Sequence, residues 1–150
     1  MITFSGLKVA VLGLTFKPGT DDLREAPSLE NIPLLLDRGA EIYAYDPVGR
    51  NNFEKVYPEG KCKQGTIHYV ENIQDALREA NVCFIFTEWK DIKEIKAETF
   101  KNLMRTPLIY DGRNIYNVKD MKINGVEYYS MGRPEGNINE FLSEVAATIR

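Results

Sequence analysis

Short apolar runs that alternate with helix-like segments are the feature that most constrains the fold of this 150-residue chain. Lys8–Leu14 (KVAVLGL) and Val82–Phe86 (VCFIF) are the clearest runs. Continuous apolar runs of this kind are typical of parallel strands that are buried between helices. The other predicted strands are Glu41–Asp46, Thr66–Val70, Pro107–Tyr110 and Val126–Ser130. The alternation predicts an α/β fold, a three-layer, Rossmann-like open sheet that is mostly parallel, with helices on both faces.

The first predicted helix has a clear start and a clear end. Ala26-Pro27-Ser28 predicts the start, because proline suits the first helical turn, and Gly39 predicts the end. Pro33 lies between them. It lacks a backbone N–H and its ring crowds the carbonyl of Leu29, at a cost of roughly 3 kcal/mol in a helix interior. We therefore expect either a kink between Leu29 and Pro33 or a helix that starts later.

Weaker patterns mark the remaining helices and one loop. Asn72 is a predicted N-cap for a helix over Ile73–Ala80. Ile92–Met104 predicts one broken helix or two short ones. We also expect a short helix over Asn51–Tyr57, followed by a loop over Pro58–Gly65.

A long, charged loop follows the first predicted strand. It holds Lys17, Asp21, Asp22 and Arg24 between apolar flanks. Ligands of open α/β sheets bind at the carboxyl ends of the strands, where this loop lies, and a plain connection needs only a few residues. The charges indicate either a ligand site or a solvated loop whose charges pair with one another.

A further cation follows the fifth predicted strand, Arg113 in the segment Asp111–Asn114 (DGRN). We expect it to lie near Lys17 and Arg24, because all three follow the carboxyl ends of parallel strands. Arginine offers a planar fork of donors and lysine a point charge, and the N-terminus of the first helix adds backbone N–H groups. The residues alone therefore support an anion or nucleotide site.

Three other residues have two interpretations each. Asp46 ends the second strand, where NAD-binding folds often place a ribose-binding acid, but without GxGxxG and with Pro47 next to it we favour a loop cap. Trp89, in Thr87-Glu88-Trp89, either covers a ligand or closes the sheet. His68, the only histidine, lies in a strand without a paired nucleophile, which favours a structural role.

Composition and charge argue against several classes of protein. With a net charge of -3 and a pI of about 5.3, we expect no nucleic-acid partner. Nothing resembles a signal peptide or a membrane span, so we expect a cytosolic protein without a membrane partner. Cys83 lies in an apolar strand, and Cys62 lies between two lysines in a loop, where it is either an incidental thiol or a slightly activated one. Neither belongs to a metal-binding pattern.

Five segments taken in order resemble the UDP-glucose/GDP-mannose dehydrogenase family, in its C-terminal UDP-binding domain. They are GLTFKPGTDDLREAPSL (Gly13–Leu29), YDP (Tyr45–Pro47), TEW (Thr87–Trp89), DGRN (Asp111–Asn114) and YYSMGR (Tyr128–Arg133). The first is long and specific, and it is most similar to family members that oxidise UDP-glucose. The likeness runs from about Lys8 to Arg133.

The resemblance implies a domain that binds the UDP part of a sugar nucleotide. The implied enzyme oxidises UDP-glucose to UDP-glucuronate and reduces two NAD. Carried over by motif, Phe16 and Lys17 contact the UDP-sugar, Arg113 contacts the uridine nucleotide and Arg24 reaches NAD.

Two neighbouring positions complete the motif. Asp21 and Asp22 match the family pattern, and we interpret them as holding the loop and Arg24 in place. Gly19 stands after Pro18, where many relatives carry a larger polar residue, which leaves the rigidity of the loop open.

Parts of the implied enzyme are missing from the chain. Neither Cys62 nor Cys83 matches the family's cysteine nucleophile, and the Gly-rich dinucleotide turn is absent. We therefore expect no catalytic residue here, no turnover by the chain alone, and NAD bound mainly by an N-terminal domain. The expected partners are UDP-glucose, the N-terminal and central domains, and further copies in a homo-oligomer.

The predicted organisation has three parts: a linker remnant at residues 1–7, a UDP-sugar-binding domain at 8–133 and a C-terminal amphipathic helix at 134–150. Within that last part, Asn137 and Glu140 resemble a capping box. One alternative keeps the family but changes the substrate to a UDP-N-acetylhexosamine or GDP-mannose. A second alternative is a free-standing nucleotide-binding module.

Overall fold

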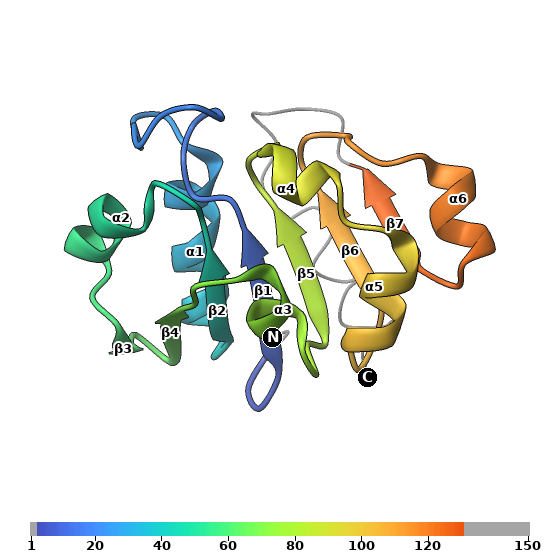
Figure 1. The fold of residues 1–150 in the computed structure, drawn as a ribbon. Coiled ribbons are helices and arrows are strands. Elements are labelled where there is room, and N and C mark those ends of the chain that lie inside the picture. The colour runs from blue at the N-terminus through green and yellow to red at the C-terminus, as the bar shows by residue number, and fades with distance from the viewer. Residues whose placement is uncertain (1–2, 131–150) are drawn as a thin grey trace.

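A seven-stranded sheet spans the part of the chain that the computed structural model describes, residues 3–130. The strand order is β3-β4-β2-β1-β5-β6-β7 (Figure 1). All neighbouring strands are parallel except β3 and β4. The strands are β1 (Lys8–Leu12), β2 (Glu41–Tyr45), β3 (Gly60–Cys62), β4 (Gly65–Tyr69), β5 (Val82–Ile85), β6 (Leu108–Asp111) and β7 (Glu127–Ser130).

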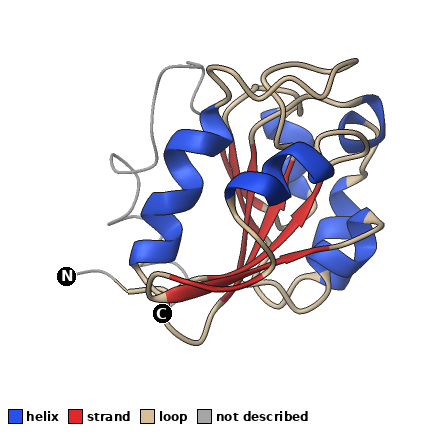
Figure 2. Cartoon of the chain, turned by 90° about the vertical axis from the view of Figure 1, so that its left-hand side faces the viewer, coloured by secondary structure: helices blue, strands red, loops and turns tan. Residues whose placement is uncertain are grey.

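Helices lie on both faces of this sheet. They are α1 (Pro27–Asp37), α2 (Arg50–Val56), α3 (Ile73–Leu77), α4 (Lys90–Lys93), α5 (Ala97–Leu103) and α6 (Val118–Ile123). Helix α1 lies behind the sheet, whereas α3, α4 and α5 lie in front of it (Figures 1 and 2). The predicted three-layer, Rossmann-like, mostly parallel fold is confirmed.

The central strand β1 explains how the core divides into two layers. Alternate residues of a strand point to opposite faces. Val9 and Val11 belong to the apolar cluster that includes Ile32 and Leu35 of α1. Ala10 and Leu12 belong to the cluster on the other face. These four residues of β1 are fully buried, as expected for a strand that is covered on both faces, whereas Lys8 at the start of the strand is half-buried.

Helix α1 begins at Pro27, so the predicted later start is wrong. Ala26 is extended before it, and Gly39 follows the helix with a φ of +86°, as the start and stop signals predicted. Pro33 lies inside the helix. The buried residues Ile32 and Leu35 on either side anchor this part of α1 in the core, which offsets the cost of proline. The kink stays a prediction.

The sequence missed two elements. The predicted loop Pro58–Gly65 contains β3, which pairs antiparallel with β4 at the edge of the sheet. Helix α6 was not predicted, although Asn117 caps it by accepting a hydrogen bond from the backbone N–H of Asp120. Of the two alternatives for Ile92–Met104, the structure has two short helices, α4 and α5, and α4 begins earlier than predicted, at Lys90.

The ends of the chain are described in part. Phe4 is fully buried in the cluster with α1, and its backbone N–H donates to the carbonyl of Arg38. Whether residues 1–7 are a linker remnant stays a prediction. The predicted helix at 134–150, with its capping box at Asn137, lies outside the described residues. Among the described helices, none is long and apolar enough to span a membrane.

Candidate functional site

The carboxyl ends of four strands lie level with one another. Leu12 of β1 pairs with Tyr45 of β2 and with Ile85 of β5, and Ile85 pairs with Asp111 of β6. The loops that follow these strands therefore leave the sheet from the same edge. The loop after β1 stands above this edge, and α4 lies over the end of β5 (Figure 1). The predicted gathering of the loops at one edge is confirmed.

The loop after β1 begins with a close approach to the turn after β5. Gly13 has a φ of +91°, and a Cβ atom there would lie 2.5 Å from Cβ of Thr87. The Thr87 hydroxyl donates to the carbonyl of Thr15 over 2.6 Å. A residue with a side chain cannot replace Gly13 without moving one of these segments.

Asp46 fixes the start of the same loop. Its carboxylate accepts hydrogen bonds from the backbone N–H groups of Leu14 and Thr15, at 2.7 and 3.2 Å. It also accepts from Val48 and Gly49, at 2.9 and 2.6 Å. Asp46 is 6% exposed. The loop-cap interpretation of Asp46 is confirmed, and it joins the loop after β2 to the loop after β1.

Trp89 adds a fifth donor to Asp46. Its indole Nε1–H donates to the Asp46 carboxylate over 3.0 Å. A second hydrogen bond joins the same two segments: the hydroxyl of Tyr45 donates to the carboxylate of Asp91. Burial and this hydrogen bond raise the pKa of Tyr45. Of the two interpretations of Trp89, the contacts support closure of the sheet, since they tie the end of β2 to the segment after β5.

Arg113 lies next to Phe16, although 97 positions separate them in the sequence. Its Nη2 donates to the carbonyl of Phe16 over 3.0 Å and to the carboxylate of Glu88 over 3.3 Å. The Arg113 side chain is only 12% exposed, whereas Phe16 is 38% exposed. Two of the predicted substrate contacts are therefore brought together.

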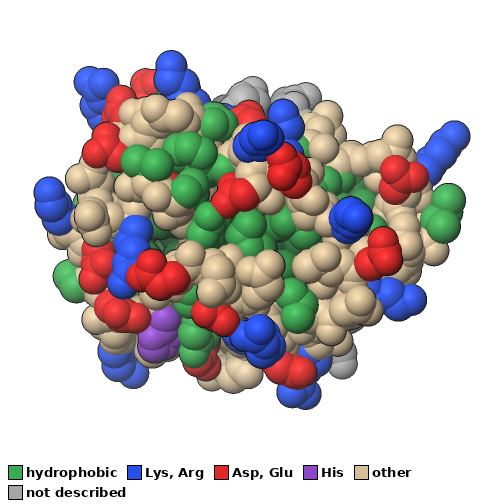
Figure 3. Space-filling view, viewed as in Figure 1, with side chains coloured by type: hydrophobic (Ala, Val, Ile, Leu, Met, Phe, Trp, Pro, Cys, Tyr) green, Lys and Arg blue, Asp and Glu red, His purple; other side chains and the backbone are tan. Residues whose placement is uncertain are grey.

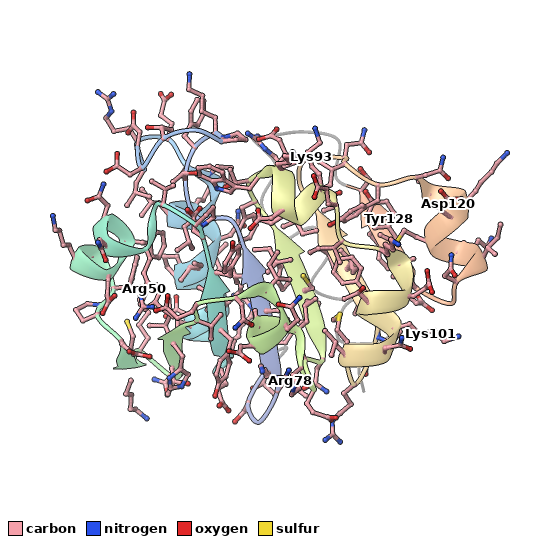
Figure 4. The ribbon with its side chains drawn as sticks, viewed as in Figure 1. Arg50, Arg78, Lys93, Lys101, Asp120 and Tyr128 are labelled. Carbon is pink, nitrogen blue, oxygen red and sulfur yellow. The ribbon has the colours of Figure 1, made fainter. Side chains whose placement is uncertain are left out.

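The segment that carries Arg113 is organised by Asp111, which is fully buried. Its carboxylate accepts from the backbone N–H groups of Arg113, Asn114 and Ile115, at 2.7 to 2.9 Å. The hydroxyl of Tyr128, labelled in Figure 4, donates to it over 2.6 Å. Burial and this hydrogen bond raise the pKa of Tyr128.

The outer part of the β1 loop carries the other predicted residues. Lys17 is exposed and forms no ion pair with any described residue within 4.0 Å, so its charge is open to an anion. Arg24 is 88% exposed and forms a bidentate pair with Asp22, with Nη2 2.8 Å from the carboxylate. Hydrogen bonds from Arg24 lower the pKa of Asp22 to about 2. Asp22 holds Arg24 as expected, whereas Asp21 contributes its backbone carbonyl to Asn52.

His68 and the two cysteines, for which the sequence indicated no catalytic role, lie outside the candidate site. The His68 ring stacks on Tyr43 with centroids 4.7 Å apart, on β4 and β2. Cys83 is buried, and burial raises the pKa of its thiol. Cys62 is half-buried and unpaired by any disulfide among the described residues.

Charge on the molecular surface is mixed. Acidic and basic side chains alternate over the face that carries α3, α4 and α5, without a continuous basic patch (Figure 3). An anion at the carboxyl edge must therefore be held by individual cations rather than by the overall field.

Comparison with known proteins identifies similar chains. Residues 10–118 match the UDP-binding domain of the UDP-glucose/GDP-mannose dehydrogenase family. A UDP-glucose 6-dehydrogenase of Bacillus subtilis, YwqF, is 42% identical over 129 residues, which cover 86% of this chain and 28% of that protein. The chain thus spans little more than a quarter of that relative's length.

Solved structures resemble the fold as well. An NDP-N-acetyl-D-galactosaminuronic acid dehydrogenase from Methanosarcina mazei aligns with a TM-score of 0.71 and 28% identity, over 87% of this chain and 26% of that one. A UDP-glucose dehydrogenase from Pyrobaculum islandicum aligns with a TM-score of 0.65 and 31% identity, over 83% of this chain and 25% of that one. In each, the likeness is confined to about a quarter of the longer chain.

Proposed function

Since this chain belongs to the UDP-glucose/GDP-mannose dehydrogenase family and matches its UDP-binding domain, we propose that it holds the UDP part of UDP-glucose for an NAD-dependent UDP-glucose 6-dehydrogenase. The whole enzyme would oxidise UDP-glucose to UDP-glucuronate and reduce two NAD. Its N-terminal and central domains would supply the chemistry, and the full-length protein would form a homo-oligomer. The cytosolic location expected from the sequence stays a prediction.

The contact between Arg113 and the Phe16 carbonyl is the observation that carries this proposal. It brings the two most informative segments of the sequence, the loop after β1 and the DGRN segment, into one place at the carboxyl edge. Arg113 would donate to the uridine nucleotide through the N–H groups that its present contacts leave available. Lys17 would meet a phosphate, and the exposed ring of Phe16 would cover an apolar part of the ligand.

The chain itself does not fit a bound dinucleotide. In NAD-binding folds an acid at the end of the second strand binds the ribose, but here Asp46 is engaged by five N–H groups of the described chain. The hollow of about 490 Å³ beside Asp46 is lined by Glu54 and Glu71, and both pair with Arg50, which Figure 4 labels. NAD would therefore be held by another domain, with the exposed Arg24 reaching toward it.

Cys83 does not fit the role of a covalent nucleophile, and Cys62 does not match the motif of the family's catalytic cysteine. Covalent oxidation needs an accessible, activated cysteine, whereas Cys83 is buried and burial raises its pKa. We expect the purified chain to form no NADH from UDP-glucose and NAD. Measurable turnover by the chain alone would contradict this part of the proposal.

Calorimetric titration with UDP, with GDP as the matched control, tests the proposal. We expect UDP to bind at least ten times more tightly than GDP, because the base contact would be made within this domain. Equal affinity for the two, or no binding of UDP, would count against it. Selectivity for GDP would support the GDP-mannose alternative instead.

The similarity to a dehydrogenase of an N-acetylated sugar nucleotide favours one alternative substrate class. The sugar would lie mostly against the domains outside this chain, so the full-length enzyme is needed to distinguish UDP-glucose from UDP-N-acetylhexosamines as the substrate. Initial rates with UDP-glucose and with UDP-N-acetylhexosamines would decide between them. A higher kcat/KM for UDP-glucose is the result we expect.

A further inference from the structure

The turn Thr87-Glu88-Trp89 contacts three different loops with three consecutive side chains. Thr87 donates to Thr15 in the loop after β1. Glu88 accepts from Arg113 in the loop after β6. Trp89 donates to Asp46 in the loop after β2.

The order of the strands makes this possible. The turn follows β5, which lies between β1 and β6, and β2 lies on the other side of β1. A side chain from the turn reaches the loops of β1 and β6 directly. Trp89 reaches further, past the end of β1, to the carboxylate at the end of β2. The Leu14 and Thr15 N–H groups that bind this carboxylate are thereby held between β2 and the turn.

Glu88 faces the guanidinium of Arg113 in partly buried surroundings. The Glu88 side chain is 32% exposed and that of Arg113 is 12% exposed. Arg113 Nη2 therefore has two acceptors, Glu88 and the Phe16 carbonyl, and both contacts favour the orientation that the side chain has in the structure. An arginine without the carboxylate has more rotamers available and loses more conformational entropy when a ligand binds.

We propose that Glu88 and Trp89 are positioning residues of the nucleotide site: Glu88 orients Arg113, and Trp89 holds the start of the β1 loop through Asp46. Neither is assigned a contact with the ligand. This inference rests on the proposed function for its effect on UDP, but the positioning itself is a property of the ligand-free chain.

Two substitutions at Glu88 test its part. Glu88→Ala should weaken UDP binding at least fivefold in calorimetry. Glu88→Gln keeps an acceptor oxygen at the same distance and should recover part of that loss. Glu98→Ala, which removes an exposed carboxylate from the first turn of α5, is the matched control and should bind UDP like the wild type.

The thermal midpoint separates positioning from general stability. Because Glu88 is one-third exposed and the pair lies outside the apolar clusters, we expect the midpoint of Glu88→Ala to fall by no more than about 4 °C. Wild-type affinity in Glu88→Ala would overturn the role of Glu88. A weaker affinity of Glu88→Ala would also overturn this role if the thermal midpoint fell strongly as well and Glu88→Gln recovered none of the affinity.

Trp89→Phe keeps an aromatic ring but removes the indole donor. In ligand-free protein, amide hydrogen exchange at Leu14 and Thr15 should become at least tenfold faster, while Val11 and Val82 in the central strands keep their protection. Unchanged exchange at Leu14 and Thr15 would overturn the role of Trp89. Faster exchange at all four positions would also overturn it, because that pattern reports global destabilisation.

This exchange measurement keeps the inference separate from the proposed function. If the wild-type chain binds no UDP, the proposed function fails for this chain. Positioning is then judged without ligand, from exchange at Leu14 and Thr15 in Trp89→Phe. For Glu88→Ala the readout is the Lys17 amide resonance, which follows the Phe16 carbonyl that Arg113 contacts. A shift of that resonance supports the role of Glu88, and an unchanged resonance refutes it.

Discussion

The two arginines of the candidate site differ in how the chain holds them. We call the group Phe16, Glu88 and Arg113 the base of the site, and the pair Asp22 and Arg24 the tip of the loop. Arg113 at the base is 12% exposed and contacts segments from two other strands. Arg24 at the tip is 88% exposed, and its ion pair is with a residue two positions away.

This difference separates a preformed contact from an adaptable one. The base is fixed by long-range contacts that the fold must form first, so its geometry exists before any ligand arrives. The tip is a local pair in water, where an exposed salt bridge contributes little to stability. A site for a nucleotide bound within the domain is expected at the base, and a contact to a neighbouring domain is expected at the tip.

The largest effect should come from the carboxylate that supports the base. Asp46→Ala leaves several buried N–H groups without an acceptor, at a cost of about 3 kcal/mol in the free energy of unfolding. Urea denaturation measures this cost. Asp37→Ala is the control, since Asp37 is exposed and its one ion pair within residues 3–130 is with the exposed Lys63, and it should cost under about 1 kcal/mol. Equal costs would mean that Asp46 does not organise the loops.

Removing the arginine at the base should weaken ligand binding. Arg113→Ala should raise the Kd for UDP about tenfold, or about 1.4 kcal/mol, because a charge-assisted contact is lost. Calorimetry at fixed ionic strength measures the change. An affinity equal to that of the wild type would remove Arg113 from the site.

Removing the arginine at the tip should leave UDP binding almost intact. Arg24→Ala is expected to change the Kd for UDP by less than about twofold, or about 0.4 kcal/mol, because its proposed partner is NAD on another domain. The same titration measures it. If Arg24→Ala and Arg113→Ala behave alike, the distinction between base and tip is wrong.

The smallest effect concerns pH at the tip. Hydrogen bonds from Arg24 lower the pKa of Asp22 from 3.8 to about 2. The stabilisation from this depressed pKa is therefore present above about pH 4 and is lost as the pH falls toward 2. Carboxyl resonances followed by NMR should show a midpoint near 2, which Arg24→Ala moves up toward 3.8. A wild-type midpoint near 3.8 would show that the pair does not persist in solution.

The sequence predicted the parts of the fold that local patterns determine. Strands such as Val82–Ile85 are continuous apolar runs, and the ends of α1 are marked by Pro27 and Gly39. It missed β3, because Gly60–Cys62 becomes a strand only by pairing with β4. It also missed α6, although Asn117 caps that helix as Asn72 caps α3, by accepting a hydrogen bond from a backbone N–H three residues later.

The candidate site was predicted as a list of residues rather than as a network. Phe16 and Arg113 were expected near one edge, but their direct contact depends on the register of β1, β5 and β6. The partners Glu88 and Asp46 belong to quoted motifs, yet nothing local indicates that Asp46 binds Trp89 across 43 positions. Such contacts follow from strand order, which the apolar pattern does not specify.

An NMR titration of the isotope-labelled chain with UDP tests most directly the claim that the base holds the nucleotide. We predict that amide shifts concentrate at Phe16, Lys17, Gly112 and Arg113, with small changes at Asp22 and Arg24. Shifts that concentrate at the tip, or around the hollow beside Asp46, or that do not appear at all, would contradict the claim.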